Sequence, residues 1–253
     1  MNGYGCWTLF RKEVRRFSKV LGQTVLAPMV TAMLYLLVFS HVMRDRVEVY
    51  EGVAYTAFLI PGLMMMSVIQ NAFANTSSSL TQSKIMGNVV FLLMPPLSSL
   101  EIFLAFVGAA LLRATLVALG VYVVALVFIP LPLEAPGILL IMLLLSAATL
   151  AVLGMIAGII ADKFEHLAVF QNFVILPASF LSGVFYSIHS LPDFWRELSH
   201  YNPFFYMIDG FRYGFFGVGD ASPVLSMAVV ALSFVVISCV CLMMLHRGYK
   251  LRP

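Results

Sequence analysis

The sequence predicts an all-α protein that crosses a membrane several times, and three observations support this fold class. Of the 253 residues, 61% are hydrophobic and only 11% are charged, whereas about 25% of the residues in soluble domains are charged. The mean hydropathy is +0.97. The charged residues are clustered and leave long uncharged stretches, and a transmembrane helix needs about 20 apolar residues. No room remains for a soluble domain of ordinary size, so we expect residues 1–253 to form a single transmembrane domain.

The first segment, residues 4–21, predicts an amphipathic helix that lies in the membrane interface. Apolar residues recur at helical spacing on one face, and basic residues fill much of the remainder. Such a helix buries its apolar face at headgroup depth and turns its basic residues toward the lipid phosphates. A solvated tail with chance periodicity is the alternative. The apolar residues are Trp7, Phe10, Val14, Phe17 and Leu21, and the basic residues are Arg11, Lys12, Arg15, Arg16 and Lys19.

Six apolar stretches follow and predict six transmembrane helices. The third stretch is longer than a bilayer needs, so either its ends project or the helix tilts. Pro28, Pro61 and Pro177 lie inside spans, where neighbouring helices can satisfy the freed carbonyl groups. The spans are roughly residues 23–43, 54–75, 100–129, 137–160, 167–187 and 223–245.

The basic residues predict the orientation of the chain, because cytoplasmic loops carry an excess of Lys and Arg. With six spans, both termini lie on the same side of the membrane. Ten Lys and Arg residues fall on that side, including Lys84 and Lys163 in loops, and four fall on the opposite side. We therefore expect both termini in the cytoplasm.

Two connections between spans are longer than simple turns. The cytoplasmic segment 76–99 is polar at first and is long enough for a short helix along the membrane surface. The outer segment 188–222 is rich in aromatic residues and fits re-entrant half-helices that dip into the outer interface, where aromatic rings prefer to sit. The expected breaks in the outer segment are at Pro192, Pro203 and Gly210.

The sequence disfavours enzymatic, metal and nucleic-acid chemistry. A P-loop requires Gly-Lys followed by Ser or Thr, and Gly-Lys occurs nowhere in the chain, so any ATPase must be another polypeptide. Ser182 and Gly183 resemble part of the rhomboid-protease motif, but Phe180 replaces its first glycine, and every histidine falls at a span end or in a loop. No two histidines are four residues apart, as a helical zinc pair requires. The net charge of +3 is too small to indicate nucleic-acid binding.

Arg113 is a basic residue well inside a predicted span. An unpaired charge at mid-bilayer is costly, so Arg113 should face protein, water or a lipid phosphate. Two interpretations remain open: an anchor or gate for an anionic substrate, and a structural contact or a snorkelling side chain. Few acidic residues lie within the spans, which disfavours an ion-coupled carrier. In the fourth span, Gly154 and Gly158 permit close approach of another helix.

Several stretches of the sequence resemble a known family of membrane proteins. Residues 180–186 (FLSGVFY), followed by Leu191-Pro192, Asn202-Pro203 and residues 209–214 (DGFRYG), are similar to the C-terminal signature of ABC-2 type transporter permeases. Residues 58–63 (FLIPGL) and 71–75 (NAFAN) resemble the second-span pattern of the same family. The order of elements matches along nearly the whole chain, and the resemblance is closest to the bacterial branch with YadH-like permeases and nodulation-factor exporters.

This resemblance implies the type V exporter fold and a permease in the bacterial inner membrane that has no ATPase of its own. It implies a homodimer of permeases bound to two ATP-binding cassette ATPase subunits, which hold ATP and magnesium, so that no cofactor is expected on this chain. It also implies that residues 77–96 contain the coupling helix that docks into the ATPase. Relatives often carry acidic residues before the proline of this segment, where Asn88-Val89-Val90 stands here, so specific salt bridges to the ATPase are not implied.

We therefore expect a permease that exports a lipid-linked, glycan or amphipathic small-molecule substrate by alternating access. An ATP-independent carrier or channel is the alternative, and an intramembrane hydrolase is a further one. The residues expected to contact the ATPase are Lys84, Asn88, Pro95, Arg15 and Arg16. The residues expected along the substrate path are Arg113, Tyr186, Phe205, Tyr206 and Arg212.

Overall fold

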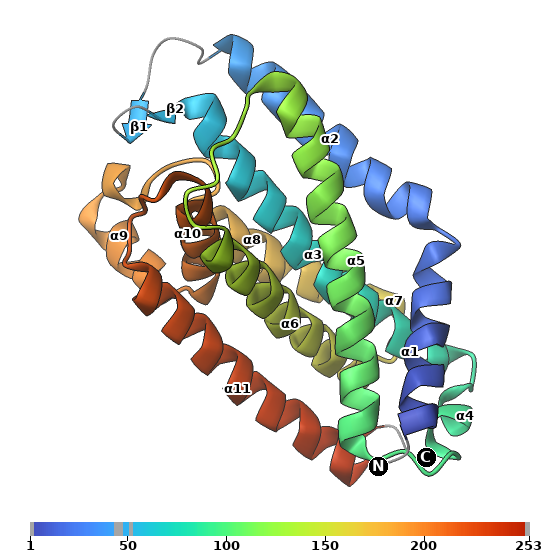
Figure 1. Ribbon diagram of the computed structural model, residues 1–253. Coiled ribbons are helices and arrows are strands. Elements are labelled where there is room, and N and C mark those ends of the chain that lie inside the picture. Colours follow the sequence, from blue (N-terminus) through green and yellow to red (C-terminus); the bar gives the residue numbers. More distant parts are fainter. Residues whose placement is uncertain (1–2, 43–47, 51–52, 251–253) are drawn as a thin grey trace.

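The computed structural model describes residues 3–42, 48–50 and 53–250, and the part it describes is almost entirely helical (Figure 1). A short antiparallel pair, β1 (Glu48–Tyr50) and β2 (Val53–Ala54), precedes the third helix. The longer helices are α1 (Gly3–Ser18), α2 (Leu21–Val42), α3 (Tyr55–Ile85), α5 (Ser99–Phe128), α6 (Pro136–Ile160), α10 (Pro203–Phe216) and α11 (Pro223–Arg247). The shorter ones are α4 (Val89–Leu93), α7 (Phe164–Phe170), the π-helical η1 (Gln171–Ile175), α8 (Leu176–Phe180), the 3₁₀ turn η2 (Ile188–Ser190) and α9 (Asp193–His200).

Five of the described helices are long and apolar enough to cross a membrane: α2, α3, α5, α6 and α11. They correspond to five of the six predicted spans. The central helices are α3 and α6, whose most apolar windows are 67% and 61% buried, whereas the corresponding windows of α2 and α11 are only 17% buried. Figure 1 shows α2 and α11 on opposite sides of the bundle, with α3 and α6 between them. The chain is thus an all-α polytopic membrane protein.

The regular helix predicted over 167–187 is wrong in its extent. The helical run there is made of α7, η1 and α8, which contribute 7, 5 and 5 residues. Pro177 has no N–H to continue the ladder of hydrogen bonds, and a π-helical turn directly precedes its helix. The helix ends at Phe180, and Gly183 in the turn beyond it has a φ of 75°.

Close packing of α3 against α6 depends on two glycines, as their spacing predicts. A Cβ atom on Gly154 would clash with Thr76 Oγ1 and with the carbonyl oxygen of Phe73. A Cβ atom on Gly158 would lie 2.9 Å from the carbonyl oxygen of Ser77. Thr76 Oγ1 donates to the carbonyl oxygen of Ala151 at 2.6 Å and ties the two backbones together.

Helix α3 continues ten residues beyond the predicted end of the second span, so the polar stretch that begins the segment 76–99 is helical. Three of its hydroxyl groups donate to carbonyl oxygens four residues earlier: Ser77 to Phe73, Ser78 to Ala74 and Ser83 to Ser79. Such bonds satisfy the hydroxyl groups without leaving the helix. The expected short helix follows as α4.

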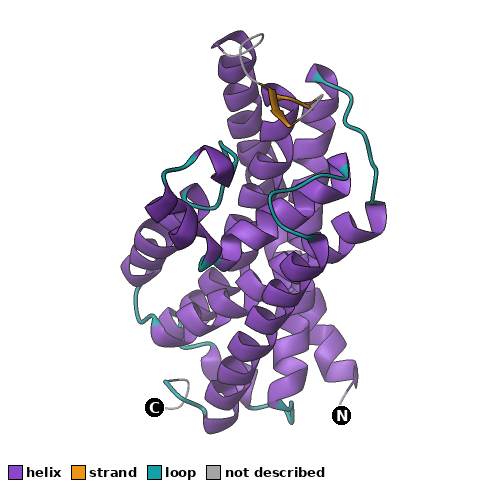
Figure 2. Cartoon of the chain, turned by 90° about the vertical axis from the view of Figure 1, so that its left-hand side faces the viewer, coloured by secondary structure: helices purple, strands orange, loops and turns teal. Residues whose placement is uncertain are grey.

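Both ends of the described chain lie at the same end of the molecule. The helix predicted over 4–21 is present as α1, which packs along α5. Figure 2 shows the beginning of α1 and the end of α11 at one end of the bundle and the strand pair at the other. Glu101, near the beginning of α5, forms a capping box with Ser98, because the side chain of each accepts a hydrogen bond from the backbone of the other.

The segment 188–222 forms the two short helices η2 and α9 and then the longer α10. Breaks occur next to Pro192 and Pro203, as predicted. The predicted break at Gly210 is wrong, because Gly210 lies inside α10. A Cβ atom there would lie 2.7 Å from the Cε of Met142 and 3.0 Å from the Cβ of Ser226, so this glycine allows α10 to pack against α6 and α11.

Candidate functional site

A polar stripe runs along the part of α3 that is open to the outside of the bundle. Between residues 66 and 78 most side chains of α3 are buried, and the half-buried ones recur every three or four residues, which places them on one face of the helix. Four of these six side chains are polar. The half-buried residues are Met66, Ser67, Gln70, Asn71, Ala74 and Ser78.

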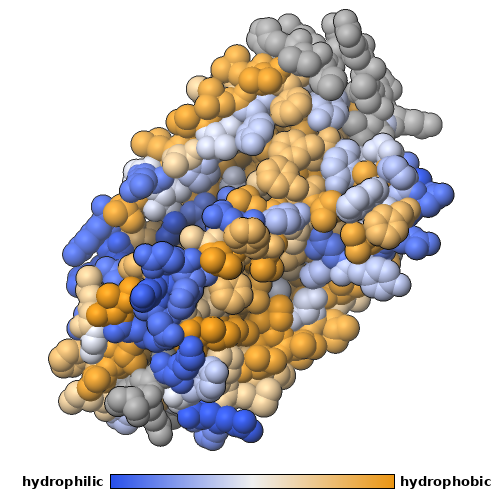
Figure 3. Space-filling view, turned by 180° about the vertical axis from the view of Figure 1, so that it is seen from behind, coloured by the Kyte–Doolittle hydropathy of each residue, from blue (hydrophilic) through white to orange (hydrophobic). Residues whose placement is uncertain are grey.

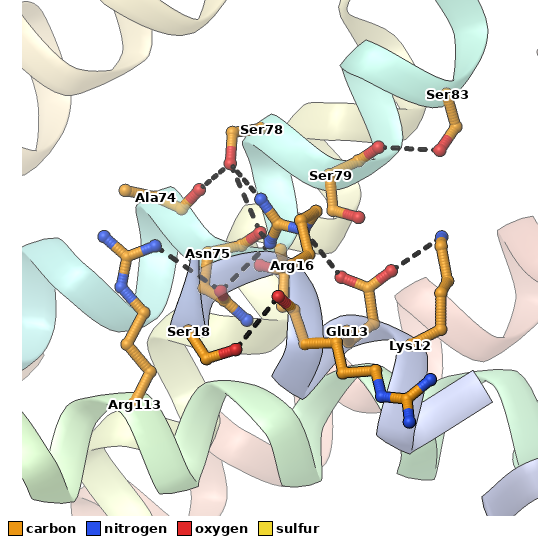
Figure 4. A network of polar contacts seen from close by, with 12 residues as sticks. Lys12, Glu13, Arg16, Ser18, Ala74, Asn75, Ser78, Ser79, Ser83 and Arg113 are labelled. Atoms are coloured by element: carbon orange, nitrogen blue, oxygen red, sulfur yellow. Dashed lines mark hydrogen bonds and ion pairs between the residues drawn. The ribbon is translucent and has the colours of Figure 1, made fainter. Parts of the chain in front are cut away.

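At the lower end of this stripe, Arg16 of α1 is held by an internal network (Figure 4). Its Nη2 donates to the backbone oxygen of Asn75 at 2.7 Å and to the side-chain oxygen of Asn75 at 3.0 Å. Its Nε donates to Glu13 at 3.0 Å, and Lys12 donates to the same carboxylate at 2.8 Å. Glu13 is fully buried. Charge-assisted bonds of this kind are stronger than neutral ones, so they fix α1 against α3.

Arg113 approaches the same asparagine from α5. Its Nη2 donates to the side-chain oxygen of Asn71 at 2.9 Å, and its Nη1 lies 3.5 Å from the side-chain oxygen of Asn75. Figure 4 shows Arg16 and Arg113 pointing toward Asn75 from different sides. The structural contact, one of the two interpretations of Arg113, is therefore present. No pattern in the sequence places Arg16 beside Arg113, although the spacing of polar residues in the second span marks the helix face that both arginines contact.

Two hollows flank the polar stripe of α3. One, of about 680 Å³, lies between α2 and α3 and is lined by both arginines, Arg16 and Arg113. The other, of about 390 Å³, lies between α3 and the α7–η1 run. Gln70, Asn71 and Ser78 line both hollows, so the two lie on either side of one polar wall. In the view from behind, hydrophilic side chains gather on the lower left of the molecule beside extensive hydrophobic surface (Figure 3).

Lys84, an expected ATPase contact, is engaged within its own chain. Its ammonium donates to the carbonyl oxygens of Ile159 and Ala161 at 2.9 and 2.7 Å and to the carboxylate of Asp162 at 2.8 Å. Lys250 also donates to Asp162, at 3.2 Å. Hydrogen bonds from these two lysines hold the pKa of the Asp162 carboxyl below its usual value, and the bond from Lys84 has the larger effect.

The other expected ATPase contacts, apart from Arg16, are exposed. Asn88, Pro95 and Arg15 all present their side chains to the surface. Around them lies an exposed apolar cluster at the end of α3 and along α4, which we call the α4 patch. Large apolar groups that are exposed together are typical of interaction sites. The α4 patch consists of Ile85, Met86, Val90, Phe91 and Met94, which are 52%, 62%, 54%, 70% and 71% exposed.

Most of the expected substrate-path residues lie inside the bundle, toward the end that carries the strand pair. Arg212 is 1% exposed, its guanidinium carbon lies 3.7 Å from the centre of the Phe58 ring, and its Nη2 donates to the carbonyl oxygen of Gly183 at 2.8 Å. Phe205 and Tyr206 are buried too. Tyr186 is half-buried. None of these four lines either hollow beside α3, whereas Arg113 does.

A carboxylate pair that the sequence analysis did not identify organises the outer loops. Asp220 accepts hydrogen bonds from the hydroxyls of Tyr50 at 3.0 Å and Ser187 at 2.7 Å and from the backbone N–H of Ile188 at 3.0 Å. Asp209 in turn accepts from the backbone N–H of Asp220 at 2.8 Å. Burial raises the pKa of Tyr50 above its ordinary value. These bonds tie the strand pair to the loops before α9 and α11.

Comparison with known proteins identifies the family to which this arrangement of helices corresponds. The family model for the ABC-2 type transporter matches residues 4–216. The inner membrane transport permease YadH of Escherichia coli (strain K12) is 36% identical over 245 residues, which cover 97% of this chain and 96% of that protein. Nodulation protein J of Rhizobium meliloti (strain 1021) is 24% identical over 217 residues, which cover 83% and 81%. Nodulation protein J of Rhizobium leguminosarum bv. viciae is 24% identical over 247 residues, which cover 97% and 95%.

Proposed function

The chain belongs to the ABC-2 type transporter family and is a permease component of the membrane, and from this premise we infer that it is the permease subunit of an exporter driven by a separate ATP-binding cassette ATPase. ATP and magnesium are bound by that partner, and this chain supplies the path through the bilayer. The observation that carries the proposal is the continuity of α3 from the outer strand pair to the α4 patch.

Helix α3 contains 31 residues and is therefore about 46 Å long, which exceeds the hydrocarbon thickness of about 30 Å. Its middle part carries the polar stripe, and its last turns lead into α4. Because a continuous helix transmits displacement along its axis, a force applied at α4 reaches the wall of the two hollows. The residues 77–96 thereby couple the ATPase to the path.

The surface that meets the ATPase is the α4 patch together with the exposed side chains of Asn88, Pro95 and Arg15. Lys84 does not contact the ATPase itself. Its ammonium fixes the end of α3 to the end of α6. Arg16 acts similarly by fixing α1 to α3. A docked ATPase therefore moves α1, α3 and α6 as a connected group.

The polar stripe of α3 needs a polar environment, because unsatisfied polar groups are costly in lipid. A second copy of the chain placed over the two hollows would enclose the stripe in a water-filled path between two permeases. Nucleotide drives alternating access only if the two states of this dimer bind the nucleotide-loaded ATPase with different affinities. The substrate that this path suits is amphipathic: a lipid-linked glycan or a small molecule of mixed polarity, moved from the cytoplasm or the inner leaflet.

The shared end of α1 and α11 is the cytoplasmic end in this proposal, and the membrane is the inner membrane of a bacterium. The basic residues of α1 and the ends of α3 and α11 then meet the anionic cytoplasmic leaflet, as the positive-inside rule expects. The outer segment 188–222 lies at the opposite face, where its aromatic residues occupy the interface.

Affinity purification of the tagged chain from its native membranes tests the proposal, with bound proteins identified by mass spectrometry. We expect an ATP-binding cassette ATPase to co-purify with the wild type and to be lost from Phe91→Asp. Phe194→Asp is the matched control, since Phe91 and Phe194 are both 70% exposed but belong to α4 and α9. Co-purification of no ATPase, together with transport that persists without ATP, would replace the proposal by an ATP-independent carrier.

A further inference from the structure

Two guanidinium groups in the membrane domain share one neutral oxygen. The side-chain oxygen of Asn75 lies 3.0 Å from Nη2 of Arg16 and 3.5 Å from Nη1 of Arg113. Like charges repel strongly where water is scarce, so an anion bound beside these two cations would lower the cost of holding them together. The arrangement therefore has the charge pattern of an anion site.

The described residues near this site contain fewer negative charges than positive ones. Glu13 is shared by Lys12 and Arg16, and among residues 3–42, 48–50 and 53–250 no ion pair to a carboxylate is found for Arg113. Hydrogen-bond donors are also in excess, because Nε of Arg113 and Nδ2 of Asn75 are buried without an acceptor in the described part of the chain. A group that only accepts hydrogen bonds and carries negative charge would correct both imbalances.

The hollow of about 680 Å³ between α2 and α3 gives such a group a place to bind. Arg16 and Arg113 both line it, and the wall that faces them is of mixed polarity. Val20, just before α2, and Ala27 and Pro28 of α2 are apolar, whereas Gln23, Thr24 and Thr31 of α2 are polar. A helix with the composition of α1 lies at headgroup depth, so Arg16 is placed near the level of lipid phosphates. The hollow thus joins two guanidinium groups to a wall that is partly apolar.

We propose that this hollow binds the phosphate group of an amphiphile, with Arg16 and Arg113 as its anion ligands and the apolar side chains of Val20, Ala27 and Pro28 beside its hydrocarbon tail. Guanidinium groups are suited to phosphate because their N–H donors match its oxygens. The site rests on the contacts of this chain alone and does not depend on the proposed ATPase partner or on the direction of transport.

Native mass spectrometry of the full-length protein in a maltoside detergent tests the site by titration with three probes. These are phosphatidic acid, which has tail and phosphate, diacylglycerol, which has the tail alone, and inorganic phosphate. We expect phosphatidic acid to bind at least about tenfold more tightly than either of the others, the size expected for a charge-assisted contact. Binding of diacylglycerol as tight as that of phosphatidic acid would overturn the anion site, and equally tight binding of inorganic phosphate would overturn the role of the tail.

Two variants locate the phosphate. Arg113→Gln should weaken binding of phosphatidic acid about tenfold, and Arg113→Lys should recover part of it. Asn71→Asp places a carboxylate where an oxygen already lies 2.9 Å from Arg113, so it should satisfy the guanidinium internally and weaken binding about as much while preserving the fold. Arg247→Gln, an exposed residue at the end of α11, removes the same charge elsewhere and should leave affinity unchanged. Wild-type affinity in both Arg113→Gln and Asn71→Asp, or an equal loss in Arg247→Gln, would overturn the assignment.

Discussion

The ammonium nitrogen of Lys84 lies 2.8 Å from the carboxylate of Asp162, which places the last turn of α3 against the end of α6. The same ammonium donates hydrogen bonds to two carbonyl oxygens at that end of α6, those of Ile159 and Ala161. A cation at a helix C-terminus is also favoured by the helix dipole. The two central helices are therefore joined at the end that leads to α4, and a displacement of one there displaces the other.

Replacing Lys84 by Met should destabilise the protein by about 1–3 kcal/mol, the range for bonds from a charged donor whose loss leaves acceptors unsatisfied. The measurement is the thermal unfolding midpoint of the purified protein in detergent. Lys250→Met is the matched control, because Lys250 contacts the same carboxylate from a side chain that is 40% exposed, against 13% for Lys84. Equal midpoints for the two variants would contradict the role given to Lys84.

Acid should weaken the contact between the ends of α3 and α6, because it protonates the carboxylate of Asp162. Its pKa is depressed in the folded protein by hydrogen bonds from Lys84 and Lys250, so the carboxylate stabilises the fold above its unfolded pKa, about 3.9. That contribution is lost as the pH falls through the folded-state pKa, which is lower still. Unfolding midpoints measured between about pH 3 and pH 7 should therefore fall more steeply at the acid end for the wild type than for Asp162→Asn. If the unfolding midpoints of the two proteins fall in parallel as the pH is lowered, ionisation of Asp162 does not contribute to stability.

Much of the fold could be predicted from the sequence because the membrane imposes simple rules on it. The apolar stretches gave α2, α3, α5, α6 and α11, and the alternation of basic and apolar residues gave α1. The apolar pattern does not predict the extension of α3, because polar residues after an apolar span are typical of a loop. Hydroxyl groups that bond within the helix, as Ser77 and Ser83 do, make such a stretch compatible with helix.

The polar sites were harder to predict because they depend on distant parts of the chain. Arg16 and Asn75 lie 59 residues apart in sequence, and Asn75 and Arg113 lie 38 apart, and no local pattern relates them. Arg212 is one of the residues expected along the substrate path, and the structure encloses it between the Phe58 ring and a backbone carbonyl group. Burial of this kind becomes visible only once the helices are packed.

Gly154→Ala should destabilise the α3–α6 contact by about 1–3 kcal/mol, the cost typical of overpacking. The added methyl group would meet Thr76 and the backbone of Phe73, and neither can withdraw without separating the helices. Gly137→Ala is the control in the same helix, since nothing lies within 4 Å of a Cβ atom there. Thermal unfolding of both variants in detergent checks this, and a loss in Gly137→Ala as large as that in Gly154→Ala would refute the packing argument.

Arg212→Gln should reduce stability by about 2–4 kcal/mol, because it removes both a charge-assisted hydrogen bond and a cation–π contact. Arg196→Gln should cost less, about 1 kcal/mol, since the partially exposed Arg196 pairs with the exposed Asp193. Chemical denaturation followed by near-ultraviolet circular dichroism distinguishes the two. An Arg212→Gln variant of normal stability but altered transport would instead assign Arg212 to the substrate path.

The polar stripe of α3 should be reached by water from inside the membrane domain. Gln70 is half-buried and lines both hollows beside α3. If water reaches these hollows, the thiol of a Gln70→Cys variant should ionise. The thiolate is the form that reacts with a membrane-impermeant maleimide. Leu119→Cys is the comparison, as Leu119 is 54% exposed on the apolar surface of α5 and its thiol would face lipid. Both variants need a background in which Cys6, Cys239 and Cys241 are replaced. In reconstituted vesicles we expect labelling of position 70 and little at 119. If position 70 stays unlabelled while 119 reacts, the stripe is sealed from water, and α3 does not form the wall of a transport path.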